Sequence, residues 1–351
     1  MLEDKNPELT PISVYGEFGL IKHLTENFSF ENSSTEISIG DDCAVINPEG
    51  QKVVITTDVL AEGVHFNLGY VPLKHLGYKA VAVNLSDVAA MNAKPTQILV
   101  AIAASNRFPV EALEEIYVGI SLACKHYKVD LVGGDTTSSN SGLVITITAI
   151  GLEESGNIVA RSGAKQNDLL VVTGDLGGAY MGLQILEREH SVFLANPNMQ
   201  PEMEGFDYIL ERQLKPEART DIKAILKVLD IQPTSMIDVS DGLSSETLHL
   251  SDQSKVGFRI YEEKIPMDSL TISTAEEFNL NPVMCALNGG EDYELLFTIS
   301  PTDFEKIKNH PDFTIIGHAV DLQQGNYLVA RGSGELIALN AQGWDAFLNR
   351  G

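Results

Sequence analysis

Short apolar runs that end in acidic residues are the feature that most constrains how this chain folds. Asp residues stand beside Gly, Ser or Thr in five clusters, and most of these follow an apolar stretch typical of a buried strand. A single cluster of this kind is more often a turn or a helix cap, because Asp, Ser and Gly are ordinary turn residues. Five of them favour a functional role. The clusters span residues 40–42, 56–58, 84–87, 133–137 and 238–242.

Clustered oxygen ligands of this type suit Mg²⁺, which proteins hold through a few carboxylates, waters and substrate phosphates. If the fold gathers the clusters, they predict a site for phosphate chemistry. Asp87 is the clearest single candidate, because it interrupts an otherwise apolar helical stretch, where an unpaired carboxylate is costly. Pairing with a metal is one remedy, and a salt bridge to a lysine such as Lys79 is the alternative.

Composition limits the class of protein. The 351 residues carry 24 Lys and Arg against 49 Asp and Glu, a formal charge of −25. A nucleic-acid surface needs a basic patch, so the balance argues against one. Hydrophobic residues make up 44% and charged residues 21%, so the chain can bury sizeable cores. A solvated acidic surface accounts for much of the charge, and metal-binding carboxylates for only part of it.

We expect a cytoplasmic protein without a membrane partner. The three cysteines are isolated and form no CxxC pair, which gives no support to a zinc ribbon or a disulfide framework. The first residues are polar and acidic, unlike a signal peptide. No apolar run approaches the length of a membrane span.

Strand and helix patterns alternate along the whole chain, which indicates an α/β or α+β fold. A polar, turn-rich stretch at 153–157 marks the expected boundary between domains at 1–155 and 156–351. Residues 189–204 are expected to form a loop. The predicted strands are 52–57, 96–103, 129–132, 143–150, 169–173, 235–239, 293–299 and 314–316. The predicted helices are 72–92, 109–123, 177–188, 216–229 and 244–251.

The familiar nucleotide and calcium motifs are absent from the sequence. There is no GxxxxGK[ST] and no GxGxxG. The turn at 174–178 is Gly-rich, so it either meets a phosphate at a helix N-terminus or allows close backbone packing. Asp238-Val239-Ser240-Asp241-Gly242 places its glycine one position too early for an EF-hand. Instead, Asp238 ends a predicted strand and Asp241 begins a predicted helix.

Three further residues have open interpretations. His65 closely follows the cluster at 56–58, so a ligand contact is as good an interpretation as a structural role. Glu291 and Asp292 lie in a Gly-rich segment before a predicted strand, and the alternative to a site there is an ordinary polar turn.

Eight motifs together resemble those of the thiamine-monophosphate kinase family. They follow that family's order and extend from about Gly16 to Trp344. Aminoimidazole ribonucleotide synthetase, selenophosphate synthetase and a hydrogenase maturation factor share the acidic nucleotide site, but the His65 motif and residues 289–295 resemble the thiamine enzyme. The motifs are Gly40–Ala44, Thr56–Asp58, Glu62–Phe66, Asn84–Met91, Gly133–Thr137, Arg161–Ala164, Asp238–Leu243 and Gly289–Leu295.

The resemblance implies a two-domain fold like that of aminoimidazole ribonucleotide synthetase. The N-terminal domain would bind metal and ATP, and its sheet would form a barrel with a second subunit, giving a homodimer. The C-terminal domain would be α/β. The implied activity is phosphorylation of thiamine monophosphate by ATP, the co-substrate, with several Mg²⁺ ions. At 174–179 the chain departs from the family's hydroxyl-bearing pattern, so a hydroxyl contact there is not expected.

The resemblance also implies roles for individual residues. The metal ligands would be Asp42, Thr56, Thr57, Asp58, Asp87, Asp135, Asp238 and Asp241. The ATP contacts would be Tyr117, Gly134, Asp135, Arg161 and Ser240, with Tyr117 stacking on adenine. The acceptor contacts would be His65, Glu291 and Trp344.

No catalytic side chain is expected. In-line phosphoryl transfer depends on positioning and charge neutralisation more than on covalent catalysis. A phosphate monoester, with a second pKa of about 6, is already ionised near neutral pH and needs no general base. The competing hypotheses are a non-enzymatic cation- or nucleotide-binding protein, which would not need Arg161 or Glu291, and a sibling enzyme with another acceptor.

Overall fold

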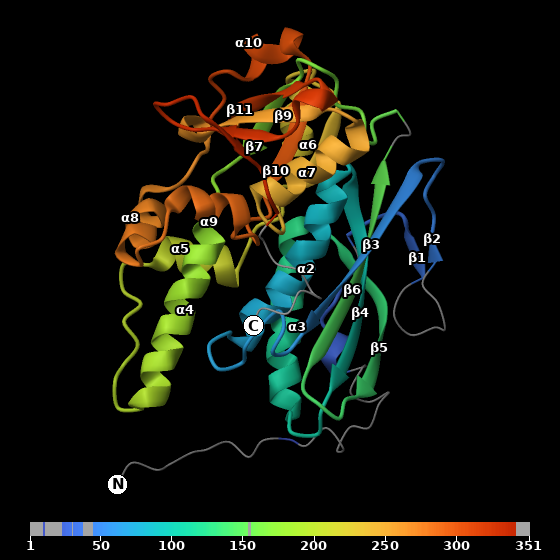
Figure 1. The fold of residues 1–351 in the computed structure, drawn as a ribbon. Coiled ribbons are helices and arrows are strands. Elements are labelled where there is room, and N and C mark those ends of the chain that lie inside the picture. The colour runs from blue at the N-terminus through green and yellow to red at the C-terminus, as the bar shows by residue number, and fades with distance from the viewer. Residues whose placement is uncertain (1–9, 11–22, 30, 38–44, 154–155, 342–351) are drawn as a thin grey trace. The chain divides into compact units, whose positions relative to one another are not determined.

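The structure is a computed structural model that describes residues 10, 23–29, 31–37, 45–153 and 156–341. The described residues form two compact units (Figure 1). Unit 1 takes in described residues of 1–84 and 95–152, and unit 2 those of 85–94 and 153–351. The α/β class expected from the sequence is confirmed, since both units combine a sheet with helices. The domain assignment at 1–155 and 156–351 stays a prediction.

Unit 1 contains a four-stranded sheet in the order β3-β6-β4-β5 and a two-stranded sheet of β1 and β2. Strands β4 and β5 are parallel, with Gln97 opposite Asp130 and Ala101 opposite Asp135. Strands β3 and β5 therefore form the two opposite edges of the larger sheet. The strands are β1 (Thr35–Ile37), β2 (Val45–Ile46), β3 (Lys52–Ala61), β4 (Lys94–Ala104), β5 (Asp130–Ser138) and β6 (Val144–Glu153).

The strand predicted at 52–57 continues to Ala61, so the prediction that the cluster at 56–58 ends the strand is wrong. Side chains alternate between the two faces of a strand, and in β3 the even-numbered residues from Val54 to Leu60 are more buried than their neighbours. The Thr56 and Asp58 side chains thus lie on the inner face. Thr57 lies on the outer face, and apolar burial at Leu60 carries the strand past the acidic cluster.

Helices α2 (Leu73–Ala90) and α3 (Val110–Tyr127) lie side by side in Figure 1. Two glycines allow the helices to approach closely where they cross. A Cβ on Gly77 would lie 2.0 Å from the Ile116 carbonyl oxygen, and one on Gly119 would lie 1.9 Å from that of Lys74. Residues 76–86 of α2 are all buried, as expected of a helix that is apolar on every side. Asp87 is the first residue after them that is only half-buried.

Unit 2 is built on a seven-stranded sheet in the order β13-β12-β9-β11-β7-β10-β8. Its neighbouring strands are antiparallel except for β12 and β9, which are parallel. The strands are β7 (Leu169–Thr173), β8 (Ser235–Asp238), β9 (Gly257–Tyr261), β10 (Leu295–Ile299), β11 (Phe313–Val320), β12 (Tyr327–Val329) and β13 (Leu336–Ala338).

The structure has helices at all three places predicted in unit 2, two of them with corrected bounds, and, among the described residues, four further α-helices that were not predicted. The predicted helix at 216–229 begins only at Ile222, because Arg219 turns aside to bind Glu294 and Asp221. The predicted loop at 189–204 begins later, since α4 continues to Ala195. The α-helices are α4 (Gly178–Ala195), α5 (Asp207–Leu214), α6 (Ile222–Val228), α7 (Leu243–Ser254), α8 (Ser269–Glu277), α9 (Pro282–Asn288) and α10 (Phe304–Ile307). The 3₁₀ helices are η2 (Glu262–Lys264), η3 (Pro301–Asp303) and η4 (Leu322–Gln324).

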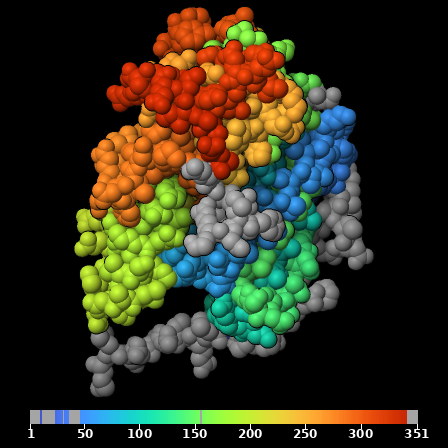
Figure 2. Space-filling view, viewed as in Figure 1, coloured from blue at the N-terminus to red at the C-terminus, as the bar shows by residue number. Residues whose placement is uncertain are grey.

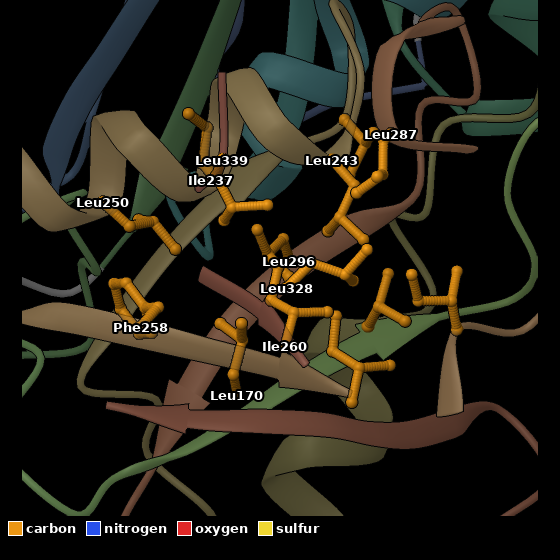
Figure 3. Packing of buried hydrophobic residues seen from close by; sticks show 14 of the residues in the cluster. Leu170, Ile237, Leu243, Leu250, Phe258, Ile260, Leu287, Leu296, Leu328 and Leu339 are labelled. Atoms are coloured by element: carbon orange, nitrogen blue, oxygen red, sulfur yellow. The ribbon is translucent and has the colours of Figure 1, made fainter. Parts of the chain in front are cut away.

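Two apolar clusters cover the two faces of the unit 2 sheet. The first joins Leu170, Ile237 and Leu296 of the sheet to Leu243 and Leu250 of α7 (Figure 3). The second joins Val171, Met236 and Phe297 to α6 and, from α2, to Ala89 and Ala90. In Figure 2 the yellow-green α4 and the orange segments α8 and α9 meet in one continuous surface of unit 2. Because both apolar clusters include residues of β8, the end of this strand is packed on both faces of the sheet.

We predict that Gly119→Ala destabilises unit 1, although the same change in an ordinary helix is stabilising by roughly 0.5–1 kcal/mol. The added methyl group would meet the Lys74 carbonyl oxygen, so the loss should be about 1–3 kcal/mol. Urea unfolding followed by circular dichroism measures it. Gly156→Ala is the control, because a Cβ there meets no atom within 4 Å. Equal stability of both variants would contradict the close helix crossing.

Candidate active site

Most of the residues predicted for the site lie within the described parts of the two units. Asp42 and Trp344 lie outside the described residues. Unit 1 holds Thr56, Thr57, Asp58, His65, Tyr117, Gly134 and Asp135. Unit 2 holds Asp87, Arg161, Asp238, Ser240, Asp241 and Glu291.

Asp238 is the centre of the acidic group in unit 2. It ends strand β8, as predicted, and its side chain is buried. The Ser86 hydroxyl donates to Asp238 Oδ2 at 2.7 Å. Burial raises the pKa of Asp238 to about 7, and the nearby Asp87 carboxylate raises it further, against the lowering effect of Ser86 and Arg161. A carboxylate pair held in this way needs a proton or a cation.

The turn after Asp238 is held from inside unit 2 by Glu246, on the first turn of α7. Its Oε1 accepts from the Asp241 backbone N–H at 3.1 Å. Burial raises the pKa of Glu246 well above its usual range, and the carboxylates of Asp241 and Asp238 act in the same direction. Gly242 has φ 115°, and a Cβ there would lie 2.6 Å from the Leu287 carbonyl oxygen. Only glycine fits this turn.

The segment 289–294 lies directly beside residues 238–242. The N–H of Glu291 donates to the Ser240 carbonyl at 2.7 Å, and that of Tyr293 donates to the Val239 carbonyl at 2.9 Å. Glu291 and Tyr293 both have positive φ, 59° and 53°, a conformation that costs a non-glycine residue about 1–3 kcal/mol. The surrounding contacts impose this backbone, and the choice between a site and an ordinary polar turn stays a prediction.

Asp292 decides between a phosphate contact and close backbone packing, the two interpretations of the Gly-rich turn 174–178. Its Oδ2 accepts from the Gly177 N–H at 2.8 Å and its Oδ1 from the Ala179 N–H at 3.4 Å. The N-terminus of α4 is therefore capped by the protein's own carboxylate, and the turn serves close packing. Burial raises the pKa of Asp292 to about 7, although the Arg212 guanidinium lowers it.

The segment 161–164 is anchored in the same unit. The Ser254 hydroxyl, at the end of α7, donates to the Arg161 carbonyl at 3.0 Å and accepts from the backbone N–H groups of Gly163 and Ala164 at 3.1 Å. The Arg161 guanidinium lowers the pKa of Asp238, so its positive charge reaches the acidic group. Because its side chain is exposed, it is also available to an anionic ligand.

The acidic residues of unit 1 lie on opposite edges of its sheet. Asp58 is in β3, where its N–H donates to Asn84 Oδ1 at 3.0 Å, and Asp135 is in β5. Two strands lie between them, so three strand spacings separate β3 from β5, about 14 Å. Gly134 is required by the sheet itself, because a Cβ there would lie 1.8 Å from the Val100 carbonyl oxygen. Within one chain, Asp58 and Asp135 are too far apart to hold one ion.

His65 is oriented by its own turn. The Ala61 N–H donates to His65 Nδ1 at 3.1 Å, so the neutral imidazole carries its proton on Nε2. Glu62 braces this turn through an ion pair with Arg107 and a bond from the Leu143 N–H at 2.9 Å. The His65 side chain therefore presents a hydrogen-bond donor.

Tyr117 is buried in α3, and its ring meets that of Phe28 edge-on at 6.4 Å between centroids. Burial raises the pKa of Tyr117 to about 12. A role in stacking on adenine stays a prediction.

The donor set fits Mg²⁺ rather than a metal enclosed by protein ligands. Among the described residues, no group of three or more His, Cys, Asp or Glu side chains is arranged to hold a metal ion. Mg²⁺ commonly takes one or two carboxylates and completes its shell with water and substrate phosphate. The Asp87 and Asp238 carboxylates, with Arg161 nearby for a phosphate, match that demand.

Sequence patterns did not identify three residues that organise the unit 2 group. Ser86 was inside a recognised cluster but was not assigned a role. Gln213 carries no local signal, because its partner Glu291 lies 78 positions away in another element. For Glu246, the isolated carboxylate on the apolar face of α7 was the usable clue.

The comparisons with known proteins show the family of the chain. Residues 40–152 match the family model described as AIR synthase related protein, N-terminal domain. The chain is 33% identical over 337 residues to the thiamine-monophosphate kinase of Bacillus subtilis (strain 168), covering 94% of this chain and 99% of that protein. The chain belongs to the thiamine-monophosphate kinase family.

Other members of the thiamine-monophosphate kinase family agree in sequence and in fold. The enzyme of Aquifex aeolicus (strain VF5) is 36% identical over 285 residues, covering 81% of this chain and 85% of that protein. The solved structure of AaThiL complexed with AMPPCP and TMP superposes with a TM-score of 0.73 at 31% identity, covering 97% of this chain and 100% of that one. The aminoimidazole ribonucleotide synthetase-like fold is thus confirmed. In the part of the chain that the structure describes, no helix has the length and apolarity to cross a membrane.

We predict that Asp238→Asn stabilises the metal-free protein more at pH 8 than at pH 5. Folding raises the pKa of Asp238 from 3.8 to about 7, so the stability that this group contributes is fully present below pH 4 and is lost as pH rises to about 7. Asparagine does not titrate and still accepts from Ser86. The gain should be on the order of 2 kcal/mol, several degrees in Tm.

Thermal unfolding in the presence of a chelator, at both pH values, measures this effect. Asp252→Asn is the matched control on the surface of α7, where a hydrogen bond from Lys255 lowers the pKa, so it should give no gain at pH 8. An Asp238→Asn variant that melts below wild type at pH 8 would show that the carboxylate pair is not repulsive.

Proposed function

We propose that this protein transfers the terminal phosphoryl group of ATP to thiamine monophosphate, giving thiamine diphosphate and ADP, with Mg²⁺ required. The observation that carries the proposal is the group in unit 2. Hydrogen bonds hold Ser86 against Asp238 and the segment 289–294 against residues 239–240, and the Asp87 and Arg161 charges act on Asp238. AaThiL complexed with AMPPCP, an ATP analogue, and TMP has the same fold.

The charges of the residues explain which of them would bind the metal and which the phosphates. Donor and acceptor both bring phosphate, so the reaction accumulates negative charge that must be neutralised. Asp87, Asp238 and Asp241 would hold Mg²⁺, which supplies that neutralisation when bound. Arg161 would bind a phosphate of ATP with its exposed guanidinium, and Ser240 would contact ATP in the turn. The acceptor oxygen is already ionised, so no side chain acts as a base.

Acceptor recognition falls to two residues with defined hydrogen-bonding character. Glu291 is a half-buried carboxylate, suited to the cation or the aminopyrimidine of the thiamine ring system. His65 would donate from Nε2, because Nδ1 already accepts from Ala61. The acceptor role of Trp344, the metal role of Asp42 and a cytoplasmic location stay predictions.

A direct assay tests the function. The protein incubated with ATP, Mg²⁺ and thiamine monophosphate should form thiamine diphosphate, measured by chromatography. A chelator should abolish the product, since the carboxylates would repel the phosphates without the cation. Unphosphorylated thiamine serves as the control acceptor and should give little or no product. Equal use of thiamine, or product formed in the presence of chelator, would contradict the assignment.

We further propose a homodimer in which two unit 1 sheets close into a barrel. The outer face of β3 exposes three apolar side chains, Val53 at 45%, Ile55 at 65% and Val59 at 48%. Such a face on an edge strand needs a cover, and a second sheet provides one. Closure would bring the β3 edge of one subunit to the β5 edge of its partner. Thr56 and Asp58, whose side chains lie on the inner face of β3, would then share a metal site with Asp135 of the partner subunit.

Mixed dimers test this arrangement. Asp58→Asn and Asp135→Asn should each lower turnover at least a hundredfold, since one well-placed electrostatic contact accounts for about 2.7–4 kcal/mol. Co-expressed, the two variants should regain about a quarter of wild-type activity, because half the dimers are mixed and one of their two sites is intact. Co-expression without any recovery would place both residues in the same subunit's site. A fully active monomer in sedimentation would exclude the dimer.

A further inference from the structure

We propose that Gln213 on α5 is a positioning residue that sets the affinity for the acceptor by orienting the Glu291 carboxylate. The inference rests on the proposed function, in which Glu291 recognises thiamine monophosphate. It assigns a specificity role to a residue of another element, 78 positions earlier in the chain.

The hydrogen bond between Gln213 and Glu291 is short, and the Gln213 side chain is buried. Gln213 Nε2 donates to Glu291 Oε2 at 2.7 Å, and Gln213 is only 5% exposed. Its Cβ is locked where α5 meets α4, because Gly182 approaches so closely that an added Cβ would lie 2.9 Å from Gln213 Cβ and 2.0 Å from the Ile209 carbonyl oxygen. Gln213 therefore has little freedom to follow Glu291, and its amide imposes one direction on the carboxylate.

The backbone of Glu291 does not fix the direction of its side chain. The N–H bond to the Ser240 carbonyl and the φ of 59° fix where the side chain begins. The three side-chain torsions of a glutamate then remain to be set, and an unrestrained carboxylate would lose entropy on binding an acceptor. A hydrogen-bond donor on a rigid helix orders the carboxylate before the acceptor binds, so this entropy is not lost on binding.

The neighbouring Arg212 shows that α5 braces the whole segment. Arg212 Nη1 donates to Glu294 Oε1 at 2.8 Å, and Nη2 donates to the Asp292 carbonyl at 3.2 Å and to the Asp175 carbonyl at 2.9 Å. The charged side chain thus neutralises Glu294 in the interior. At Glu291 the donor from α5 is instead a neutral amide, which orients the carboxylate without adding a positive charge.

The test separates the two substrates. Gln213→Met keeps the volume and removes the donor, so the KM for thiamine monophosphate should rise about tenfold, the worth of one hydrogen bond to a charged group. The KM for ATP, kcat and Tm should change little. Gln213→Glu, which sets a second carboxylate against Glu291, should give the same selective rise. Tyr208→Phe is the matched control, since it removes one α5 hydrogen bond, to Asp175 at 2.5 Å, away from Glu291.

A double-mutant cycle completes the test. In a Glu291→Ala background, Gln213→Met should add almost nothing, because the carboxylate that it orients is gone. The same tenfold rise in that background, or equal rises in both KM values with a lowered Tm, would overturn the positioning role. Wild-type protein without turnover of thiamine monophosphate would instead reject the proposed function, and this inference with it, before any variant is compared.

Discussion

The backbone pairing between residues 238–242 and 289–294 is the constraint on which the unit 2 group depends. Three bonds between main-chain atoms, from Val239, Glu291 and Tyr293, hold two loops side by side at the end of β8 and β10. Gly242 and Gly290 permit this approach, since a Cβ on Gly290 would lie 2.6 Å from the Ser240 carbonyl oxygen. Every proposed contact of Asp238, Ser240, Asp241 and Glu291 follows from that geometry.

Buried charge is the main energetic difficulty of such an arrangement. Glu294 is neutralised by Arg212 and Arg219, each at 2.8 Å, and accepts from Thr173 at 2.6 Å. Asp292 accepts from the N-terminus of α4. Asp238 accepts from the Ser86 hydroxyl and from a backbone N–H, and the Arg161 charge also lowers its pKa, while the Asp87 carboxylate raises it. Burial raises the pKa of both Asp292 and Asp238 to about 7, but Asp292 faces the Arg212 guanidinium whereas Asp238 faces a second carboxylate, Asp87, and this pair is therefore the one proposed for the metal.

Much of the site was predictable from local patterns, and the parts that were missed have a common cause. The strand end at Asp238 and the helix after Gly242 were legible because apolar periodicity and turn residues agree there. The start of the helix after Pro216 was not, because Arg219 pairs with Glu294, which is 75 residues away. Gln213 was missed for the same reason. Patterns within a window cannot report a partner in another element.

The sequence by itself determined the alternating α/β class, the acidic clusters and the family to which their order belongs. The tertiary structure decided what each carboxylate does. Glu291 and Asp292 are adjacent and chemically alike, yet one faces the Gln213 amide and the other caps α4. The structure also placed Asp58 and Asp135 on opposite edges of one sheet. Residue type and spacing encode which ligands are present, whereas strand order and long-range hydrogen bonds set their direction, burial and charge environment.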